Sequence, residues 1–105
     1  MKKFPFLFFS CRDRPGIIAE ISEFLFSENL KISNFDHFSE QKNFFAKIEL
    51  PHKFCREKFR KNFARNCAQK LRGKFEINFF EKKENENFAF KINFFFQKFQ
   101  EKFKN

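Results

Sequence analysis

The alternation of apolar and polar positions predicts four elements in the first half of the chain. Residues 4–11 are apolar at nearly every position, which is typical of a strand that is covered on both faces. Residues 17–28 place their apolar side chains at the spacing of one helical face, and Asn29 after them predicts a left-handed helix end. Residues 30–39 and 44–50 alternate as strands do, and the polar residues 40–43 between them predict a hairpin.

Two further elements complete the pattern. In residues 54–71 apolar side chains recur about every four positions, which predicts a second helix that ends near Gly73. Residues 74–80 alternate as a fourth strand. This order is the ferredoxin-like βαββαβ plan, an α+β fold in which an antiparallel sheet carries two helices on one face. Because the first strand is apolar on both sides, we expect a dimer, another domain or a ligand on the other face of the sheet.

The C-terminal residues lie outside this six-element plan. Residues 81–87 are polar and predict a linker. The apolar positions in residues 88–94 alternate as in a strand, whereas those in residues 95–103 fall at helical spacing. The predicted domains are therefore residues 1–82 and a C-terminal stub, residues 83–105, which is either the truncated start of a second domain or an apolar tail.

The turn between the first strand and the first helix is the best candidate site in the sequence. Pro15 favours a turn or a first helical position, and Gly16 allows a neighbour or a ligand to approach the backbone. Free N–H groups at the start of a helix attract anions such as a carboxylate. Asp13 can accept a hydrogen bond from an ammonium group or brace the turn.

Composition makes the pattern of apolar positions more informative than side-chain identity, because 23 of the 105 residues are Phe and neither Tyr nor Trp occurs. The formal net charge of +9 raises non-specific attraction to nucleic acids and anionic membranes. Three cysteines, Cys11, Cys55 and Cys67, lack CxxC spacing and predict a reducing, cytoplasmic location. No apolar stretch approaches the length of a membrane span, so no membrane partner is expected.

RNA binding is the alternative that the basic residues suggest. Lysines and arginines crowd residues 53–74, and RNA-recognition domains share the βαββαβ plan with exposed aromatic residues on their strands. The glycine of their central motif is missing from residues 43–46. We therefore keep RNA binding as the weaker alternative and do not expect a nucleic-acid partner.

Residue spacing predicts no catalytic, metal or cofactor site. His37, His52 and the cysteines lack the spacing of metal ligands. His37 follows Asp36, but without a nucleophile or a pocket we interpret these two as a polar pair on a strand, not as a general base. The two glycines are too few for a phosphate-binding glycine run.

Two parts of the sequence resemble a known family. Residues 10–25 (SCRDRPGIIAEISEFL) look like the opening of an ACT domain, which is marked by an aspartate shortly before a glycine at the first strand-to-helix turn. Residues 33–39 (SNFDHFS) and 43–50 (NFFAKIEL) resemble more narrowly the ACT domain at the front of formyltetrahydrofolate deformylase. This sequence has Ala46 where that family usually has Met and Lys47 where it usually has Arg.

The resemblance covers about residues 6–80 and implies a regulatory module of a hydrolase family. That family's enzyme hydrolyses 10-formyltetrahydrofolate to formate and tetrahydrofolate for purine biosynthesis, in a C-terminal formyltransferase-like domain. Residues 88–96 correspond by resemblance to the first strand of that domain, and residues 96–105 depart from the family pattern. We therefore expect this chain alone not to be catalytic, and a separate formyltransferase-like domain is an implied partner.

The ACT resemblance also implies an amino-acid effector, bound near the first strand-to-helix turn at an interface between two such domains. The implied ligand-binding residues are Arg12, Asp13, Arg14, Pro15, Gly16 and Ile17. Two alternatives stay open: Asp13 and Gly16 only shape the turn, or the chain is a stand-alone ACT regulator that acts through a protein partner. A homodimer through the sheet or the helix face is expected, and the sequence leaves the identity of the effector open.

Overall fold

The computed structural model describes residues 3–51, 54–81 and 87–104, which contain one four-stranded antiparallel sheet. Strand β1 lies inside the sheet, between β3 and β4, and the full order is β2-β3-β1-β4. The strands are β1 (Lys3–Arg12), β2 (Asn34–Glu40), β3 (Asn43–Glu49) and β4 (Lys74–Glu81). This arrangement confirms the predicted α+β, ferredoxin-like βαββαβ fold.

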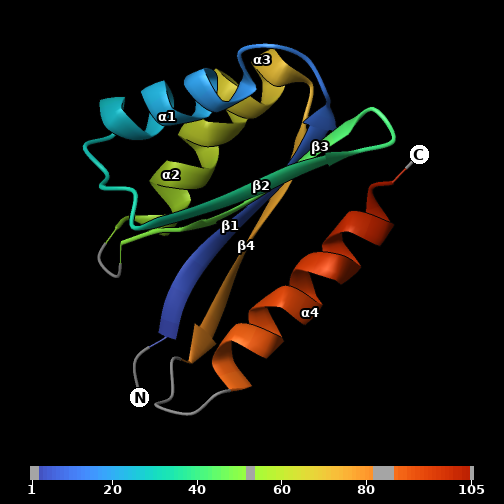
Figure 1. The fold of residues 1–105 in the computed structure, drawn as a ribbon. Coiled ribbons are helices and arrows are strands. Elements are labelled where there is room, and N and C mark those ends of the chain that lie inside the picture. Colours follow the sequence, from blue (N-terminus) through green and yellow to red (C-terminus); the bar gives the residue numbers. More distant parts are fainter. Residues whose placement is uncertain (1–2, 52–53, 82–86, 105) are drawn as a thin grey trace.

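Two helical segments cover one face of the sheet and are together called the helical layer (Figure 1). The first is α1 (Ile17–Ser27), which follows β1. The second consists of α2 (Arg56–Phe63), the π-helical turn η1 (Ala64–Ala68) and α3 (Gln69–Leu71). The backbone keeps right-handed helical dihedrals where these three parts join, so they form one continuous helix with a wider turn inside it.

The main core lies between the sheet and the helical layer. Strand β1 contributes Leu7 and Phe9, which are fully buried there, because alternate residues of a strand face the same side. Phe63 of the second helical segment packs edge-to-face on Phe9, with the ring centroids 5.8 Å apart. Ile21 and Leu25 of α1 complete this buried layer at helical spacing.

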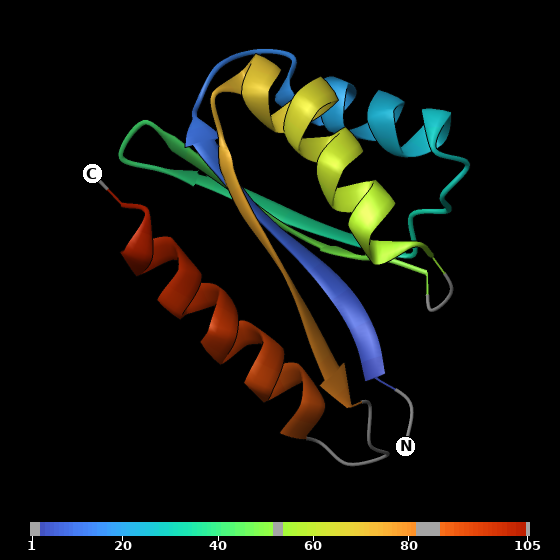
Figure 2. The same ribbon diagram turned by 180° about the vertical axis from the view of Figure 1, so that it is seen from behind.

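Helix α4 (Asn87–Lys102) covers the opposite face of the sheet (Figure 2). The strand predicted within residues 88–94 is therefore wrong. Burial follows the helical period instead, because one face of α4 must cover the apolar residues that the sheet presents. The buried residues of this second core are Phe6, Phe8, Phe45, Ile92, Phe96 and Phe99.

This second core accounts for the apolar outer face of β1. A dimer, another domain or a ligand was expected there, and within the described residues the cover is α4. The division into residues 1–82 and 83–105, with the start of a second domain in the latter, stays a prediction. Residues 82–86, which make up most of the predicted linker, lie outside the described residues, as does His52.

The ends of the helices differ in detail from the predicted ones. Asn29 takes the predicted left-handed conformation (φ 58°) after α1. The N–H of Leu30 donates to the carbonyl of Leu25, so Leu30 belongs to the end of this helix and β2 begins only at Asn34. After α3 the left-handed residue is Arg72 (φ 55°), not Gly73, which the sequence predicted as the helix stop.

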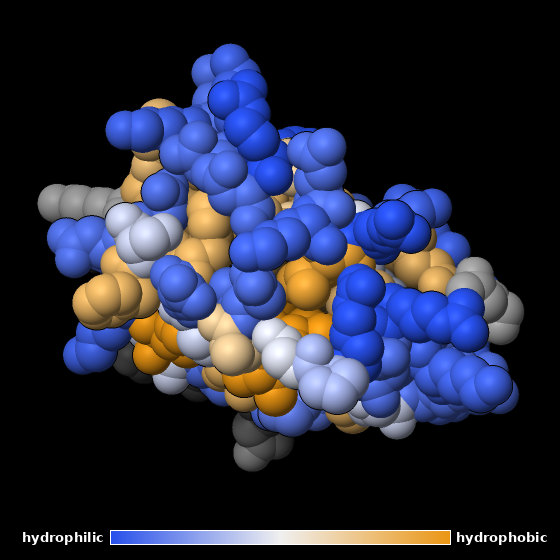
Figure 3. All heavy atoms as spheres, turned by 90° about the horizontal axis from the view of Figure 1, so that it is seen from above, coloured by the Kyte–Doolittle hydropathy of each residue, from blue (hydrophilic) through white to orange (hydrophobic). Residues whose placement is uncertain are grey.

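The outer surface of the helical layer is mainly hydrophilic, with apolar patches between the polar side chains (Figure 3). Within the described ranges we find no helix with the length and apolarity of a transmembrane span.

Candidate functional site

A solvent-open hollow of about 360 Å³ lies beside the turn that joins β1 to α1, and we call it the loop hollow. From the turn and the start of α1 it is lined by Asp13, Arg14, Gly16, Ile17, Ile18 and Ala19. From β2 and β3 it is lined by His37, Ser39 and Phe44.

The structure brings four of the six predicted ligand-binding residues to this hollow: Asp13, Arg14, Gly16 and Ile17. Pro15 is exposed on the same turn. Arg12 lines a different hollow, because it is the last residue of β1 and its neighbours there are Ser10 and Asn43. A ligand-binding role for any of the six stays a prediction.

The N-terminus of α1 presents uncapped backbone amides to the loop hollow. The N–H of Glu20 donates to the carbonyl of Gly16 over 3.0 Å and is the first helical hydrogen bond. The N–H groups of Ile17, Ile18 and Ala19 precede it and thus have no helical partner. Within the described ranges no side chain caps this helix at Gly16, and both Ile18 and Ala19 are exposed.

Gly16 is favoured by its backbone conformation. It has φ 89° and ψ 0°, a left-handed conformation that is costly for residues with a Cβ. Among the described residues, a Cβ at Gly16 would meet no atom within 4 Å, apart from those of its immediate neighbours in the chain. The expectation that Gly16 makes room for an approaching neighbour is therefore wrong within this chain, and the space beside it is open to a ligand.

Two hydrogen bonds hold the turn in place. The N–H of Asp13 donates to the carbonyl of Lys42 over 2.8 Å, which attaches the end of β1 to the β2–β3 turn. The guanidinium of Arg14 donates to the carbonyl of Leu71 at the end of α3. Within the described residues the carboxylate of Asp13 makes no hydrogen bond or ion pair, so it does not brace the turn and is free to accept one.

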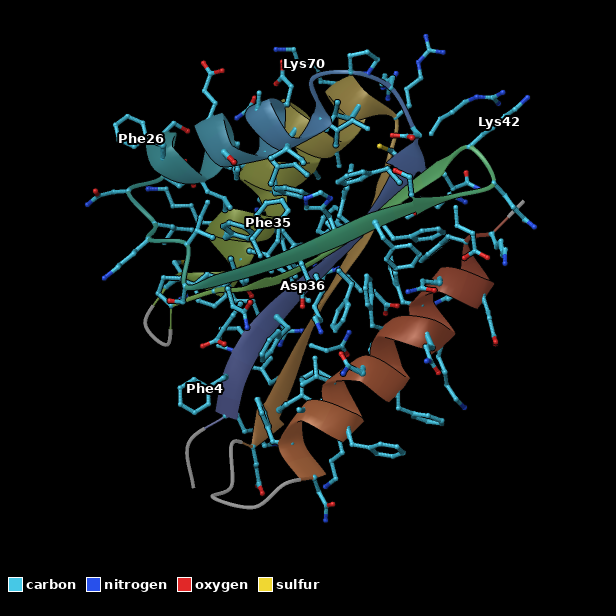
Figure 4. All side chains as sticks on the ribbon, viewed as in Figure 1. Phe4, Phe26, Phe35, Asp36, Lys42 and Lys70 are labelled. Atoms are coloured by element: carbon cyan, nitrogen blue, oxygen red, sulfur yellow. The ribbon has the colours of Figure 1, made fainter. Side chains whose placement is uncertain are left out.

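The strand side of the loop hollow could not be deduced from the sequence. His37 stacks on Phe44 of the neighbouring strand, with the ring centroids 5.7 Å apart and an interplanar angle of 22°. Asp36 lies on the other face of β2, where its carboxylate is 3.5 Å from Nζ of Lys47. Figure 4 shows this alternation, with Phe35 on the side of the helical layer and Asp36 on the side of α4. Asp36 and His37 therefore do not form the expected polar pair.

The two buried cysteines, Cys11 and Cys67, do not supply a reactive thiolate. Burial raises the pKa of the Cys67 thiol to about 12. Burial also raises the pKa of the Cys11 thiol, and nearby Arg14 opposes this shift. Both groups are protonated at neutral pH and pack as small apolar side chains. In the described part of the chain no three His, Cys, Asp or Glu side chains come together as a metal site.

Comparison with known proteins identifies the fold. No family model and no curated protein sequence matches the chain. The structure of a formyltetrahydrofolate deformylase from Pseudomonas syringae matches it with a TM-score of 0.66 and 28% identity, over 75% of this chain and 28% of that chain. A deformylase from Burkholderia mallei matches with a TM-score of 0.63 and 18% identity, over 72% of this chain and 28% of that chain. An ACT domain protein from Streptococcus pneumoniae matches with a TM-score of 0.61 and 16% identity, over 75% of this chain and 91% of that chain.

The fold and the turn between β1 and α1 define the class: the chain has the fold of an ACT domain. Within that class, its structure matches the N-terminal ACT region of formyltetrahydrofolate deformylases, as the sequence resemblance predicted. The chain spans about 28% of the length of the deformylases that it matches.

Proposed function

We propose that this domain binds a free amino acid in the loop hollow and so senses its concentration. The observation that carries the proposal is the pairing of two opposite groups in one hollow. The uncapped amides of Ile17, Ile18 and Ala19 suit a carboxylate, and the unengaged carboxylate of Asp13 suits an ammonium group. A zwitterionic amino acid carries both.

The strand side of the hollow would determine which amino acid binds. The stacked rings of His37 and Phe44 form an apolar wall with one polar edge, and the hydroxyl of Ser39 lies beside them. This wall is suited to contact the effector's side chain, while the turn holds its backbone groups.

A calorimetric unfolding screen with the twenty amino acids tests the proposal. We expect one amino acid to raise the melting temperature, because a ligand at 100 times its Kd adds about 2.7 kcal/mol to the free energy of unfolding. Asp13→Asn should abolish this response, since the amide no longer attracts an ammonium group. Glu23→Gln removes one exposed carboxylate from α1, outside the hollow, and should respond as the wild type does. Unchanged melting curves with every amino acid would contradict the sensing role.

We propose that the regulated partner is a formyltransferase-like catalytic domain, as the resemblance to the deformylases implies. We propose a cytoplasmic location for both. The support is the match to the ACT region of these enzymes. The alternative is a stand-alone ACT regulator that acts through another protein, which the match over 91% of the Streptococcus pneumoniae ACT domain protein favours. Co-purification of this chain with a formyltransferase-like protein from its own cells would distinguish the first from the second.

A homodimer of this domain would use the helical layer or a strand edge. The sheet face that the sequence also offered is occupied by α4, which buries Phe6, Phe8 and Phe45. The same cover argues against RNA binding of the RNA-recognition type, because that mode stacks bases on exposed aromatic residues of the sheet. Sedimentation velocity with and without the effector would measure the association.

A further inference from the structure

A second hollow, of about 250 Å³, lies at the corner where β1 ends, β4 begins and α4 ends. We call it the cationic hollow, because five of its nine lining residues carry a positive charge: Arg12, Arg72, Lys74, Lys102 and Lys104. No carboxylate of the residues that the structure describes lines it, and it shares none of these lining residues with the loop hollow.

Two of these cations have a structural explanation. Nζ of Lys104 lies 3.0 Å from Oε1 of Glu40, and Nζ of Lys102 lies 3.9 Å from Oε1 of Glu76. Both lysines also lie at the C-terminal end of α4, where positive charge compensates the helix dipole. Helix docking therefore accounts for Lys102 and Lys104.

The other three cations have no such explanation. The guanidinium groups of Arg12 and Arg72 make no hydrogen bond or ion pair with any residue that the structure describes. Nζ of Lys74 lies 5.4 Å from the ring centroid of Phe103 and has no carboxylate partner among those residues. Like charges around one small hollow repel each other, so folding alone gains nothing from collecting them.

The conformation of Arg72 supports a role beyond folding. It has φ 55° and ψ 45°, the left-handed conformation that favours glycine at the end of a helix. The N–H of Arg72 donates to Gln69, and the N–H of Gly73 donates to Ala68, which fixes this position. An arginine is thus kept where glycine would be less strained, although Gln41 and Lys42 in the β2–β3 turn take left-handed conformations too.

The next residue holds the corner rigid. A Cβ at Gly73 would lie 2.3 Å from Cζ of Phe9 and 2.8 Å from the carbonyl oxygen of Ser10. The backbone between Arg72 and Lys74 therefore packs directly on β1. This contact fixes where the two cations leave the chain, so they are positioned before any ligand arrives.

Buried polar groups form the floor of the cationic hollow. Ser10 and Asn43 are each only 5% exposed. The Ser10 hydroxyl has no hydrogen-bond partner among the described residues, and the amide nitrogen of Asn43 makes a single long contact of 3.4 Å to the carbonyl of Gln41. Both groups can donate to an anion in the hollow.

We propose that the cationic hollow binds the phosphate groups of a small phosphorylated molecule that carries at least two negative charges. Arginine forks match phosphate oxygens in pairs, and the hydroxyl and amide of the floor complete the set of donors. Because Lys102 is the last residue of α4 and Lys104 follows it closely, the bound anion joins this helix to the sheet and stabilises its docking.

The test is isothermal titration calorimetry of the full chain with pyrophosphate at constant ionic strength. We expect saturable binding, and we expect Arg72→Gly to weaken it on the order of tenfold or more, as the loss of a charge-assisted hydrogen bond does. Arg72→Gly should unfold at the same temperature as the wild type or a higher one, because glycine relieves the strained backbone. A loss of affinity can then not be attributed to misfolding.

The matched control is Arg60→Gln, which removes one exposed positive charge from α2, outside the hollow, and should leave pyrophosphate binding unchanged. Tighter binding of ATP than of tripolyphosphate would show that the phosphates are carried on a nucleotide, and binding of pyrophosphate alone would point to a smaller diphosphate. Absence of saturable binding at millimolar pyrophosphate, or equal loss in Arg60→Gln and Arg72→Gly, would overturn the proposal. Equal affinity for citrate would overturn the assignment to phosphate, and tighter binding of single-stranded RNA that both variants weaken equally would favour a nucleic-acid surface.

Discussion

Nζ of Lys47 in β3 donates to Oδ1 of Asn93 in α4 over 2.7 Å, and this bond joins two residues that are 46 positions apart in the sequence. The Lys47 side chain is only 10% exposed, and its other close partner is the carboxylate of Asp36, at 3.5 Å. The docked helix therefore meets a buried charge as well as an apolar face. This relationship leads to the first prediction.

Asn93→Ala is expected to lower the free energy of unfolding by about 1 kcal/mol, because it removes a hydrogen bond to a buried ammonium group. Gln97→Ala, at an exposed position of the same helix, should change it by less than about 0.5 kcal/mol. Urea unfolding measures both. In a Lys47→Met background Asn93→Ala should cost nothing, and an undiminished cost there would show that Lys47 and Asn93 do not interact.

Two phenylalanines of α4 should differ sharply in their contribution to stability. Phe99 is 1% exposed in the second core, whereas Phe90 is 70% exposed on the outer face of the helix. We expect Phe99→Ala to cost about 3–5 kcal/mol through the cavity that it leaves. Phe90→Ala should cost less than about 0.5 kcal/mol. Equal effects in urea unfolding would mean that α4 does not dock on the sheet as described.

The two glycines should respond to alanine for different reasons. Gly73→Ala drives a methyl group into Phe9 and the backbone of Ser10, so we expect a loss of about 1–3 kcal/mol or more from overpacking. Gly16→Ala meets open space and should lose only about 1 kcal/mol, which is the cost of a left-handed backbone. In a Phe9→Leu background, which shortens the clashing side chain, the cost of Gly73→Ala should shrink while that of Gly16→Ala stays the same.

Stability should fall as the pH rises from about 9 towards 12. The Cys67 thiol ordinarily has a pKa of 9.0, and burial raises the pKa in the folded state to about 12. Between these values the unfolded chain has lost a proton that the folded chain keeps, so alkaline pH favours unfolding, by roughly 2–4 kcal/mol over the window.

Variants separate this effect from the titration of lysines. Cys67→Ala should make the dependence of unfolding free energy on pH shallower, whereas Cys55→Ala, at an exposed position, should not. Identical slopes in both variants would show that the buried thiol does not titrate on unfolding.

Local pattern was sufficient to predict the βαββαβ order and the left-handed end of α1 at Asn29. The tail was not predictable in this way. Its apolar residues fit a strand over one stretch and a helix over the next, and the choice depends on whether a sheet edge or a sheet face is available to them. The face formed by Phe6 and Phe8 is available, and a helix covers it.

The candidate site, like the fold, could be predicted from the sequence only in part. The half of the loop hollow that comes from the turn could be predicted, because Asp13 and Gly16 are close in the sequence. The half formed by His37 and Phe44 depends on the pairing of β2 with β3, and alternation alone does not say which face of β2 looks towards α1. The cationic hollow was missed entirely, because its residues come from four separate segments. The sequence alone does not say which charged residues come together in space.

The π-helical turn η1 has one further consequence. Apolar residues at Phe59, Phe63, Cys67 and Leu71 recur every four positions, and in a regular α-helix such a row would rotate by about 40° at each step. The wider π-helical turn compensates for this rotation and keeps all four apolar residues against the sheet. The π-helical turn therefore sets the direction in which the chain leaves the helix at Arg72. A one-residue deletion in it would rotate Leu71 away from the sheet and displace the corner that follows.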